Sequence, residues 1–257
     1  MHMLNPHCGV ERDPRGIVRL TICNAGPLNI LNSAAIKGVR EGIEVLATER
    51  AIRALVIAGQ SEKSMIGGAD IKEMATLDQA SAEKFISGLR DLCEAARAFP
   101  APVIARIPGW CLGGGLEFAA ACDFRIASHD SKYAMPEVRV GIPSVIHAAL
   151  LPRLIGWGRT SWLLLTAENI DAATADRWGM VEQVVPAAKI GEAVERCVAS
   201  IVEGTPKAVR AQKRLMRRWE RLSLDEAVQA GIDAFAQSVA EGEHIERMGA
   251  FVNRKRK

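Results

Sequence analysis

Two hydrophobic periods alternate along the first half of the chain. Short β-branched runs bounded by glycine, asparagine or proline predict buried strands, and these runs are Ile17 to Cys23, Arg53 to Ala58, Pro102 to Ile107 and Asp123 to Ala127. Apolar residues at helical spacing predict helices between them, over residues 32–48, 78–98 and 114–121. We expect Asn32 to cap the first of these helices and Pro100 to stop the second. Strands in series with helices between them are typical of an α/β fold with a mostly parallel sheet.

After residue 143 the pattern becomes almost entirely helical. Apolar periodicity predicts helices over residues 144–155, 159–167, 171–178, 187–203, 206–221 and 224–241, and Met180 to Val185 is the one late strand. This shift predicts a core over residues 1–195, which holds the site, and a helical C-terminal region over residues 196–257. That region would pack on the core or on a neighbouring subunit.

Composition narrows the class of protein. With 257 residues, 49% of them hydrophobic, the chain can bury a sizeable core, which excludes a disordered protein. The net charge of +3 gives no global field that would attract nucleic acid or an anionic membrane. Six scattered cysteines without a CxxC pair fit a reducing cytoplasm. We find no signal-peptide layout and no apolar run of about 18 to 20 residues, so we expect no membrane partner.

The sharpest local motif is the glycine run Gly113-Gly114-Gly115, which is followed closely by Glu117. Bare backbone N–H groups at a strand-to-helix corner favour negative charge, so an oxyanion could bind there. Close packing of strand on helix would explain the glycines equally well. A nucleotide loop would not, because the Lys-Ser/Thr of a P-loop is missing and the spacing is not GxGxxG.

A second glycine pair, Gly67-Gly68, follows the strand at residues 53–58 and precedes Ala69 and Asp70. The N–H group of Ala69 could be a second oxyanion donor. The alternative is a surface turn in which Asp70 caps a short helix.

Two glutamates are candidate acid/base groups. Glu137 lies in an apolar stretch between Pro136 and Pro143, where burial would raise its pKa towards the range useful for proton transfer. Glu117 lies on an otherwise apolar helix, so its side chain either points to solvent or into a pocket. A solvent-facing loop residue is the alternative for Glu137.

Taken together and in order, these three motifs resemble the crotonase (enoyl-CoA hydratase/isomerase) superfamily, and the resemblance spans residues 15–254. It implies a spiral of ββα repeats with a helical C-terminal trimerisation region, assembled as a homotrimer or a dimer of trimers. It also implies an enoyl-CoA hydratase that adds water across the 2,3 double bond of a 2-enoyl-CoA thioester. The thioester oxygen would bind the N–H groups of Ala69 and Gly114. Glu117 would activate water, and Glu137 would exchange a proton at C2.

The resemblance also implies where coenzyme A binds. Coenzyme A is part of the substrate, so no separate cofactor and no metal is expected. The expected contacts are Ala25, Pro27, Leu28, Gly67, Gly68, Asp70, Ile71 and Lys72, together with Phe235 and Arg254 from a neighbouring subunit's C-terminal helices.

Alternatives remain at this stage. The segment after Glu137 departs from the usual hydratase pattern, which keeps an isomerase, lyase or hydrolase of the same superfamily open. Ser144 and His147, three residues apart, could form a nucleophile pair, but no orienting acid lies near them in the sequence. Basic residues between Lys207 and Arg221 and at the C-terminus suggest a nucleic-acid-binding protein, but the single tyrosine and few other aromatics argue against a stacking platform.

Overall fold

The computed structural model describes residues 1–254, without the side chains of residues 246 and 250–254. In this part of the chain the strands form two sheets, of seven and four strands. The larger sheet has the order β1 (His2–Asn5), β2 (Cys8–Arg12), β3 (Ile17–Ile22), β4 (Ala54–Gly59), β6 (Val103–Ile107), β8 (Phe124–Ser128) and β11 (Gln183–Val185). Strands β1 to β3 pair antiparallel, and the sheet is parallel from β3 to β11.

The smaller sheet has the order β10 (Ile170–Asp171), β9 (Lys132–Ala134), β7 (Trp110–Leu112) and β5 (Ser64–Ile66). Strands β4, β6 and β8 of the large sheet are each followed by a strand of the small one, namely β5, β7 and β9. Helix α3 (Gln79–Ala98) follows the first of these pairs and α4 (Gly114–Ala121) the second. The ββα spiral expected from the resemblance is therefore present.

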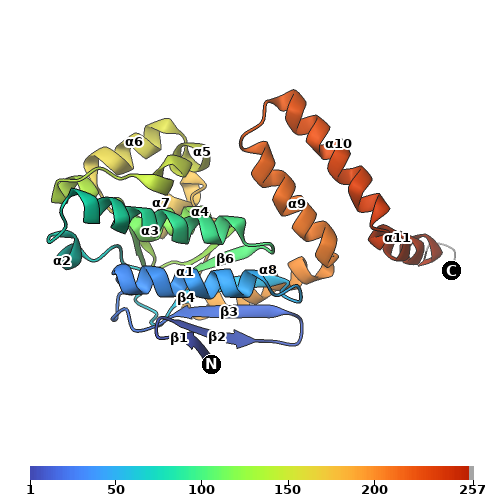
Figure 1. The fold of residues 1–257 in the computed structure, drawn as a ribbon, viewed down its shortest axis with the longest axis horizontal. Coiled ribbons are helices and arrows are strands. Elements are labelled where there is room, and N and C mark those ends of the chain that lie inside the picture. Colours follow the sequence, from blue (N-terminus) through green and yellow to red (C-terminus); the bar gives the residue numbers. More distant parts are fainter. Residues whose placement is uncertain (255–257) are drawn as a thin grey trace.

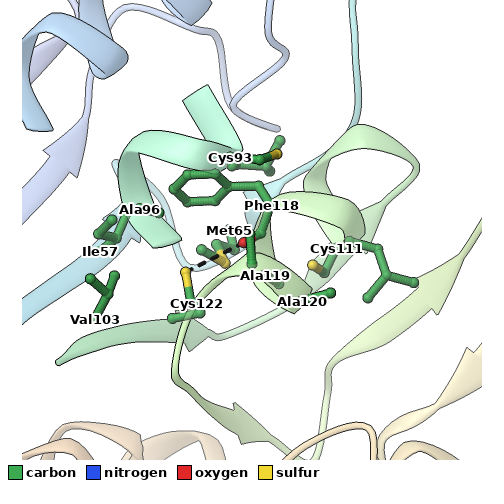
Figure 2. Packing of buried hydrophobic residues seen from close by; sticks show 14 of the residues in the cluster. Ile57, Met65, Cys93, Ala96, Val103, Cys111, Phe118, Ala119, Ala120 and Cys122 are labelled. Atoms are coloured by element: carbon green, nitrogen blue, oxygen red, sulfur yellow. Dashed lines mark hydrogen bonds between the residues drawn. The ribbon is translucent and has the colours of Figure 1, made fainter. Parts of the chain in front are cut away.

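The large sheet is covered on both faces. Side chains alternate along β4, so that Leu55 and Ile57 join the main core while Ala54 and Val56 face α8 (Ile190–Glu203). The main core also receives α1 (Ser33–Ala47), α3 and α4. Figure 2 shows Phe118 of α4 packed among Cys93, Cys111 and other buried side chains of that core. All eight residues of α4 are buried, so this helix runs through the interior.

Short helices complete the core. These are α2 (Ile71–Met74), the 3₁₀ helices η1 (Glu137–Val140), η2 (Ile146–Leu150) and η3 (Ala187–Lys189), and α5 (Leu151–Ile155), α6 (Trp157–Thr166) and α7 (Ala172–Trp178). Within residues 1–254, every helix is too short or too polar to cross a bilayer.

The last three helices project from this body, as Figure 1 shows. Helix α9 (Pro206–Trp219) is fastened to the core by Lys213, which is buried and donates to Asp123 at 2.6 Å. Helices α10 (Leu224–Ala240) and α11 (Glu243–Arg254) continue away from it. The predicted boundary at residue 195 falls inside α8, which packs on the large sheet. The two-part division itself remains a prediction.

The sequence predicts most of the long elements to within three residues, but it misses helix α11 and the strands β1, β2, β5, β7, β9 and β10. Asn32 accepts from the N–H of Ala35 and caps α1 as expected. The single helix predicted over residues 144–155 is wrong, because residues 144–145 are not helical, η2 is a 3₁₀ helix and only α5 is α-helical. The backbone of this segment is shaped instead to hydrogen-bond a buried side chain, described below.

Candidate active site

A cavity of about 130 Å³ opens where the ends of β5 and β7 meet α3 and η1. The residues that line it include Ala69 and Gly114, the two predicted backbone donors, and the two glutamates Glu117 and Glu137. Most of the remaining lining is apolar, from Met74, Phe85, Ile86, Leu89, Leu112, Val140, Ile142 and Val145. Four groups predicted from separate motifs therefore face one apolar space.

The N–H group of Ala69 is left free by the local pairing. Leu31 and Ala69 form an isolated parallel bridge, in which Leu31 N donates to Gly68 O at 2.9 Å and Asp70 N donates to Leu31 O at 2.9 Å. Both bonds of this bridge use the neighbours of Ala69 and not its own N–H. Gly68 has a φ of +114°, a conformation that glycine adopts without strain. Ala69 itself lines the cavity.

Gly114 is the first residue of α4, where N–H groups have no partner within the helix. The turn into α4 is made by Gly113, whose φ of +51° and ψ of −124° suit glycine alone. A Cβ at Gly114 would lie 2.6 Å from Cδ2 of Leu89, so the glycine also allows α3 to pack closely. Close packing, one of the two explanations that the sequence left open for the glycine run, is therefore confirmed at Gly114, and oxyanion binding remains a prediction.

Glu117 points into the cavity and not to solvent. It is only 3% exposed, and its Oε1 accepts from the N–H of Ala148 at 2.9 Å. Burial raises the pKa of Glu117 to about 8, the Ala148 N–H offsets part of that rise, and the nearby charge of Glu137 adds to it. A carboxyl with a pKa close to neutrality can give up or take a proton at little cost.

Glu137 lies at the lip of the same cavity, on η1. It is partly buried, and its Oε2 accepts from the hydroxyl of Ser144 at 2.8 Å. Burial raises the pKa of Glu137, while the hydrogen bond from Ser144 works in the opposite direction. On its other side, Oε1 lies so close to Gly113 that any Cβ there would overlap it. Gly113 and Ser144 together fix the position of this carboxylate.

The chain is similar to known proteins over nearly its whole length. The profile of the enoyl-CoA hydratase/isomerase family matches residues 12–257. This chain belongs to that family. The short-chain-enoyl-CoA hydratase of Clostridium acetobutylicum is 32% identical over 92% of this chain and 91% of its own length. The crotonyl-CoA hydratase of Syntrophomonas wolfei is 33% identical over 89% and 88%. The crystal structure of an enoyl-CoA hydratase from Mycobacterium smegmatis has a TM-score of 0.93, 29% identity and 97% coverage of both chains.

Several of the contacts that the hydratase/isomerase resemblance implies for coenzyme A lie beside the cavity. Gly67, Gly68 and Ile71 line it. Gly67 N donates to Leu28 O at 2.8 Å, which joins the loop of residues 25–28 to the cavity wall. Ala25, Pro27 and Leu28 belong to that loop, and Pro27 and Leu28 are exposed. Their contact with a ligand remains a prediction.

Asp70 and Lys72 have different surroundings. The Asp70 carboxylate accepts from the N–H groups of Lys72 and Glu73 and so caps α2, as one of the two readings of the sequence predicted. Lys72 is exposed on the first turn of that helix, where its charge is available to a ligand.

Phe235 does not line the cavity of its own chain. Phe235 is 68% exposed on α10, which extends away from the body. The side chain of Arg254 lies outside the part of the chain that the structure describes. Their expected contact with a neighbour's substrate stays a prediction.

The nucleophile pair considered from the sequence does not form. The Ser144 hydroxyl is bonded to Glu137, and Nε2 of His147 lies 2.7 Å from Oε1 of Glu94. Sequence reasoning missed the hydrogen bonds that Ser144 and Ala148 donate to the two glutamates. No local pattern signals these contacts, because Ala148 is 31 residues from Glu117 and Ser144 is 7 residues from Glu137. Within the described residues, no cluster of His, Cys, Asp and Glu could hold a metal ion.

Three of the six basic residues of α9 make structural contacts with the core. Lys213 and Arg217 both bind the Asp123 carboxylate, and Arg210 donates to the carbonyl oxygens of Arg50 and Ile52. A nucleic-acid surface would need these charges free.

Proposed function

We propose that this member of the enoyl-CoA hydratase/isomerase family is an enoyl-CoA hydratase that acts on a 2-enoyl-CoA thioester. The observation that carries the proposal is that Glu117, Glu137, Ala69 and Gly114, which come from separate motifs, line one largely apolar cavity. The hydratases of C. acetobutylicum and S. wolfei, which cover most of the chain, support it.

The mechanism follows from where charge develops. Addition of water at C3 of a conjugated thioester moves negative charge onto the carbonyl oxygen. N–H donors already aimed at that oxygen stabilise the transition state more than the ground state, and one such donor is typically worth about 3 to 4 kcal/mol. In this proposal Ala69 and Gly114 supply the two donors, and neither N–H has to give up a bond made in the bridge or the helix.

The two carboxyl groups divide the proton transfers. Glu117, buried and held by Ala148, orients the attacking water and takes its proton as the bond to C3 forms. Glu137, held by Ser144, gives a proton to C2 of the enolate. Burial raises the pKa values of both carboxyl groups towards neutral pH, where a carboxyl group can both release and take up a proton. The proposal involves no metal and no cofactor beyond the coenzyme A of the substrate.

The coenzyme A moiety is proposed to lie over the loop of residues 25–28 and the start of α2. Gly67 and Gly68 let the ligand approach the backbone, and Lys72 offers a positive charge to its phosphates. Phe235 and Arg254 of a neighbouring subunit complete this site in the proposal.

A homotrimer, or a dimer of trimers, is proposed for the assembly. Its support is an exposed apolar stripe on α10 at helical spacing, made by Leu224, Val228, Ile232, Phe235 and Val239. Light scattering tests this directly, because a particle of one chain mass would contradict it. A cytoplasmic location also remains a prediction.

Incubation with crotonyl-CoA tests the activity. We expect loss of the absorbance of the conjugated thioester and formation of 3-hydroxybutyryl-CoA. A protein that leaves crotonyl-CoA unchanged but moves the double bond of a 3-enoyl-CoA would be an isomerase. That result would overturn the hydratase proposal within the same family.

A further inference from the structure

Two cavities of very different size lie on either side of one side chain. The first is the catalytic cavity of about 130 Å³. The second is an open groove of about 620 Å³ between α1 and α3. Among the described residues, Phe85 is the only one that lines both. The Phe85 side chain is 5% exposed and belongs to the main core, so it is a packed wall and not a loose surface ring.

The path from one cavity to the other follows one face of α3. Leu89, Phe85 and Ser81 are spaced four residues apart and so lie on the same side of that helix. Leu89 lines the catalytic cavity, Phe85 lines both spaces, and Ser81 lines only the groove. At the inner end, Leu89 packs over Gly114, whose N–H is a proposed oxyanion donor. This face of α3 therefore extends from the proposed position of the thioester, past Phe85, into the groove.

A second element repeats the same order. Met74, at the end of α2, lines the catalytic cavity, while Leu77, three residues later, lines the groove. Ile36 of α1 forms part of the far wall of the groove and lies 3.5 Å from the position of a Cβ at Gly88. An apolar surface therefore continues beyond Phe85. Farther out the groove becomes polar and charged, with Lys37, Arg40, Lys84 and Asp91 on its rim.

We propose that Phe85 sets the upper limit on acyl-chain length, and that the substrate class is short-chain 2-enoyl-CoA. This inference rests on the proposed hydratase function. An acyl group that fits between the oxyanion donors and the Phe85 ring lies in a cavity lined mostly by apolar side chains. A longer one has to displace a packed aromatic ring before it reaches the groove, and overpacking of a filled core is unfavourable.

The test measures kcat/KM on 2-enoyl-CoA thioesters of four, six, eight and ten carbons. One methylene in a hydrophobic pocket changes discrimination by about 10- to 200-fold. We therefore expect wild type to favour the four-carbon over the eight-carbon substrate by at least about 100-fold. Phe85→Ala opens the wall and should raise the eight-carbon to four-carbon ratio by at least about 10-fold. Phe85→Leu, which keeps an apolar side chain in the core, should shift the ratio in the same direction by less.

Leu77→Ala is the matched control, because Leu77 lines the groove but not the catalytic cavity. It enlarges the groove and leaves the Phe85 ring in place, so its chain-length profile should stay close to wild type. Hydration of the four-carbon substrate reports that each variant is folded. If Phe85→Ala fails to fold, Phe85→Leu decides.

Three results would overturn the proposal: equal use of four and eight carbons by wild type, an unchanged ratio in the folded Phe85 variants, or an equal gain in Leu77→Ala. Binding of saturated butyryl-CoA and octanoyl-CoA, measured by calorimetry, repeats the comparison without turnover. If the protein does not hydrate crotonyl-CoA but still binds butyryl-CoA more tightly than octanoyl-CoA, the hydratase proposal is wrong and the role of Phe85 as a wall of the cavity is retained.

Discussion

The two sides of the cavity hold their carboxyl groups by different means. Glu117 comes from α4, a helix with every residue buried, and its position is set by the core around it and by a backbone N–H. Glu137 comes from η1, in which no residue is fully buried, and its position depends on one hydroxyl and one glycine. Burial in the core is therefore the main influence on the position and pKa of Glu117. The position of Glu137 depends instead on two contacts that single substitutions can remove.

This difference predicts how each side responds to change. The buried side can lose a charge without losing its shape, because the amide oxygen of a glutamine can still accept from Ala148. On the other side, the Glu137 carboxylate can be displaced without removing its charge, because Gly113 and Ser144 can be substituted while Glu137 remains. Variants that separate charge from position therefore test the two sides independently.

The largest effect is expected when either carboxyl group becomes an amide. Glu117→Gln and Glu137→Gln should each lower kcat for crotonyl-CoA by about 10²- to 10⁴-fold, the range for removal of a general acid or base. Steady-state kinetics on the folded variants checks this. If one variant keeps the wild-type rate, that carboxyl group has no part in proton transfer.

The next effect is on stability, and it should be larger for Glu117 than for the less buried Glu137. Burial raises the pKa of Glu117 from 4.5 to about 8, so between these pH values the folded chain keeps a proton that the unfolded chain has released. The stability linked to this carboxyl is complete below pH 4.5 and is lost as the pH rises to about 8. Glu117→Gln should remove that loss, by on the order of 4 kcal/mol at about 1.4 kcal/mol per pKa unit.

Urea unfolding of wild type and Glu117→Gln at pH 5 and pH 9 measures this difference. The exposed Glu83→Gln is the control and should leave the pH dependence as it is in wild type. Equal pH dependence in wild type and Glu117→Gln would contradict the burial argument.

A smaller loss is expected when the lip is distorted. Gly113→Ala adds a methyl group that overlaps the Glu137 carboxylate and forces alanine into a backbone conformation suited to glycine. Because a displacement of about 1 Å at a reacting group can cost about 10²-fold in rate, we expect a kcat loss of that order. Gly158→Ala on α6 has open space around it and should be silent. A Gly113→Ala enzyme with full activity would show that Glu137 tolerates movement.

The smallest effect is expected from Ser144→Ala, which removes one hydrogen bond. A bond to a charged group is worth about 1.5 to 3 kcal/mol, so we expect about a tenfold loss of kcat/KM at neutral pH. The lost donor normally lowers the pKa of Glu137, so the limb of the pH profile governed by Glu137 should move to higher pH. Ser144→Thr should restore the limb. An unmoved limb in Ser144→Ala would mean that Ser144 does not hold Glu137 in the working enzyme.

The sequence predicts the residues of the candidate site better than the short elements around them. The N–H donors and both glutamates stand in local motifs, but Ala69 and Glu137 lie beside or on elements of only three or four residues. Strands β5, β7 and β9 have three residues each, too few for alternation to be recognised, so the second sheet could not be read from the pattern.

Contacts between segments were beyond local reasoning. The buried position of Glu117 follows from α4 being covered on all sides, which depends on elements far away in the chain. Ser144 and Ala148 reach the two carboxyl groups only because the segment after Gly141 gives up a regular helix. Tertiary contacts outweighed helix propensity there.

Proton exchange at C2 of butyryl-CoA in D₂O tests the division of labour between the two carboxyl groups most directly. This thioester has no double bond to hydrate, so enolate formation at the two N–H donors and proton transfer at C2 are the only steps left. We predict that wild type and Glu117→Gln introduce deuterium at C2, as seen by NMR, and that Glu137→Gln does not. Exchange that survives in Glu137→Gln but disappears in Glu117→Gln, or that is absent in an active wild type, would contradict the account.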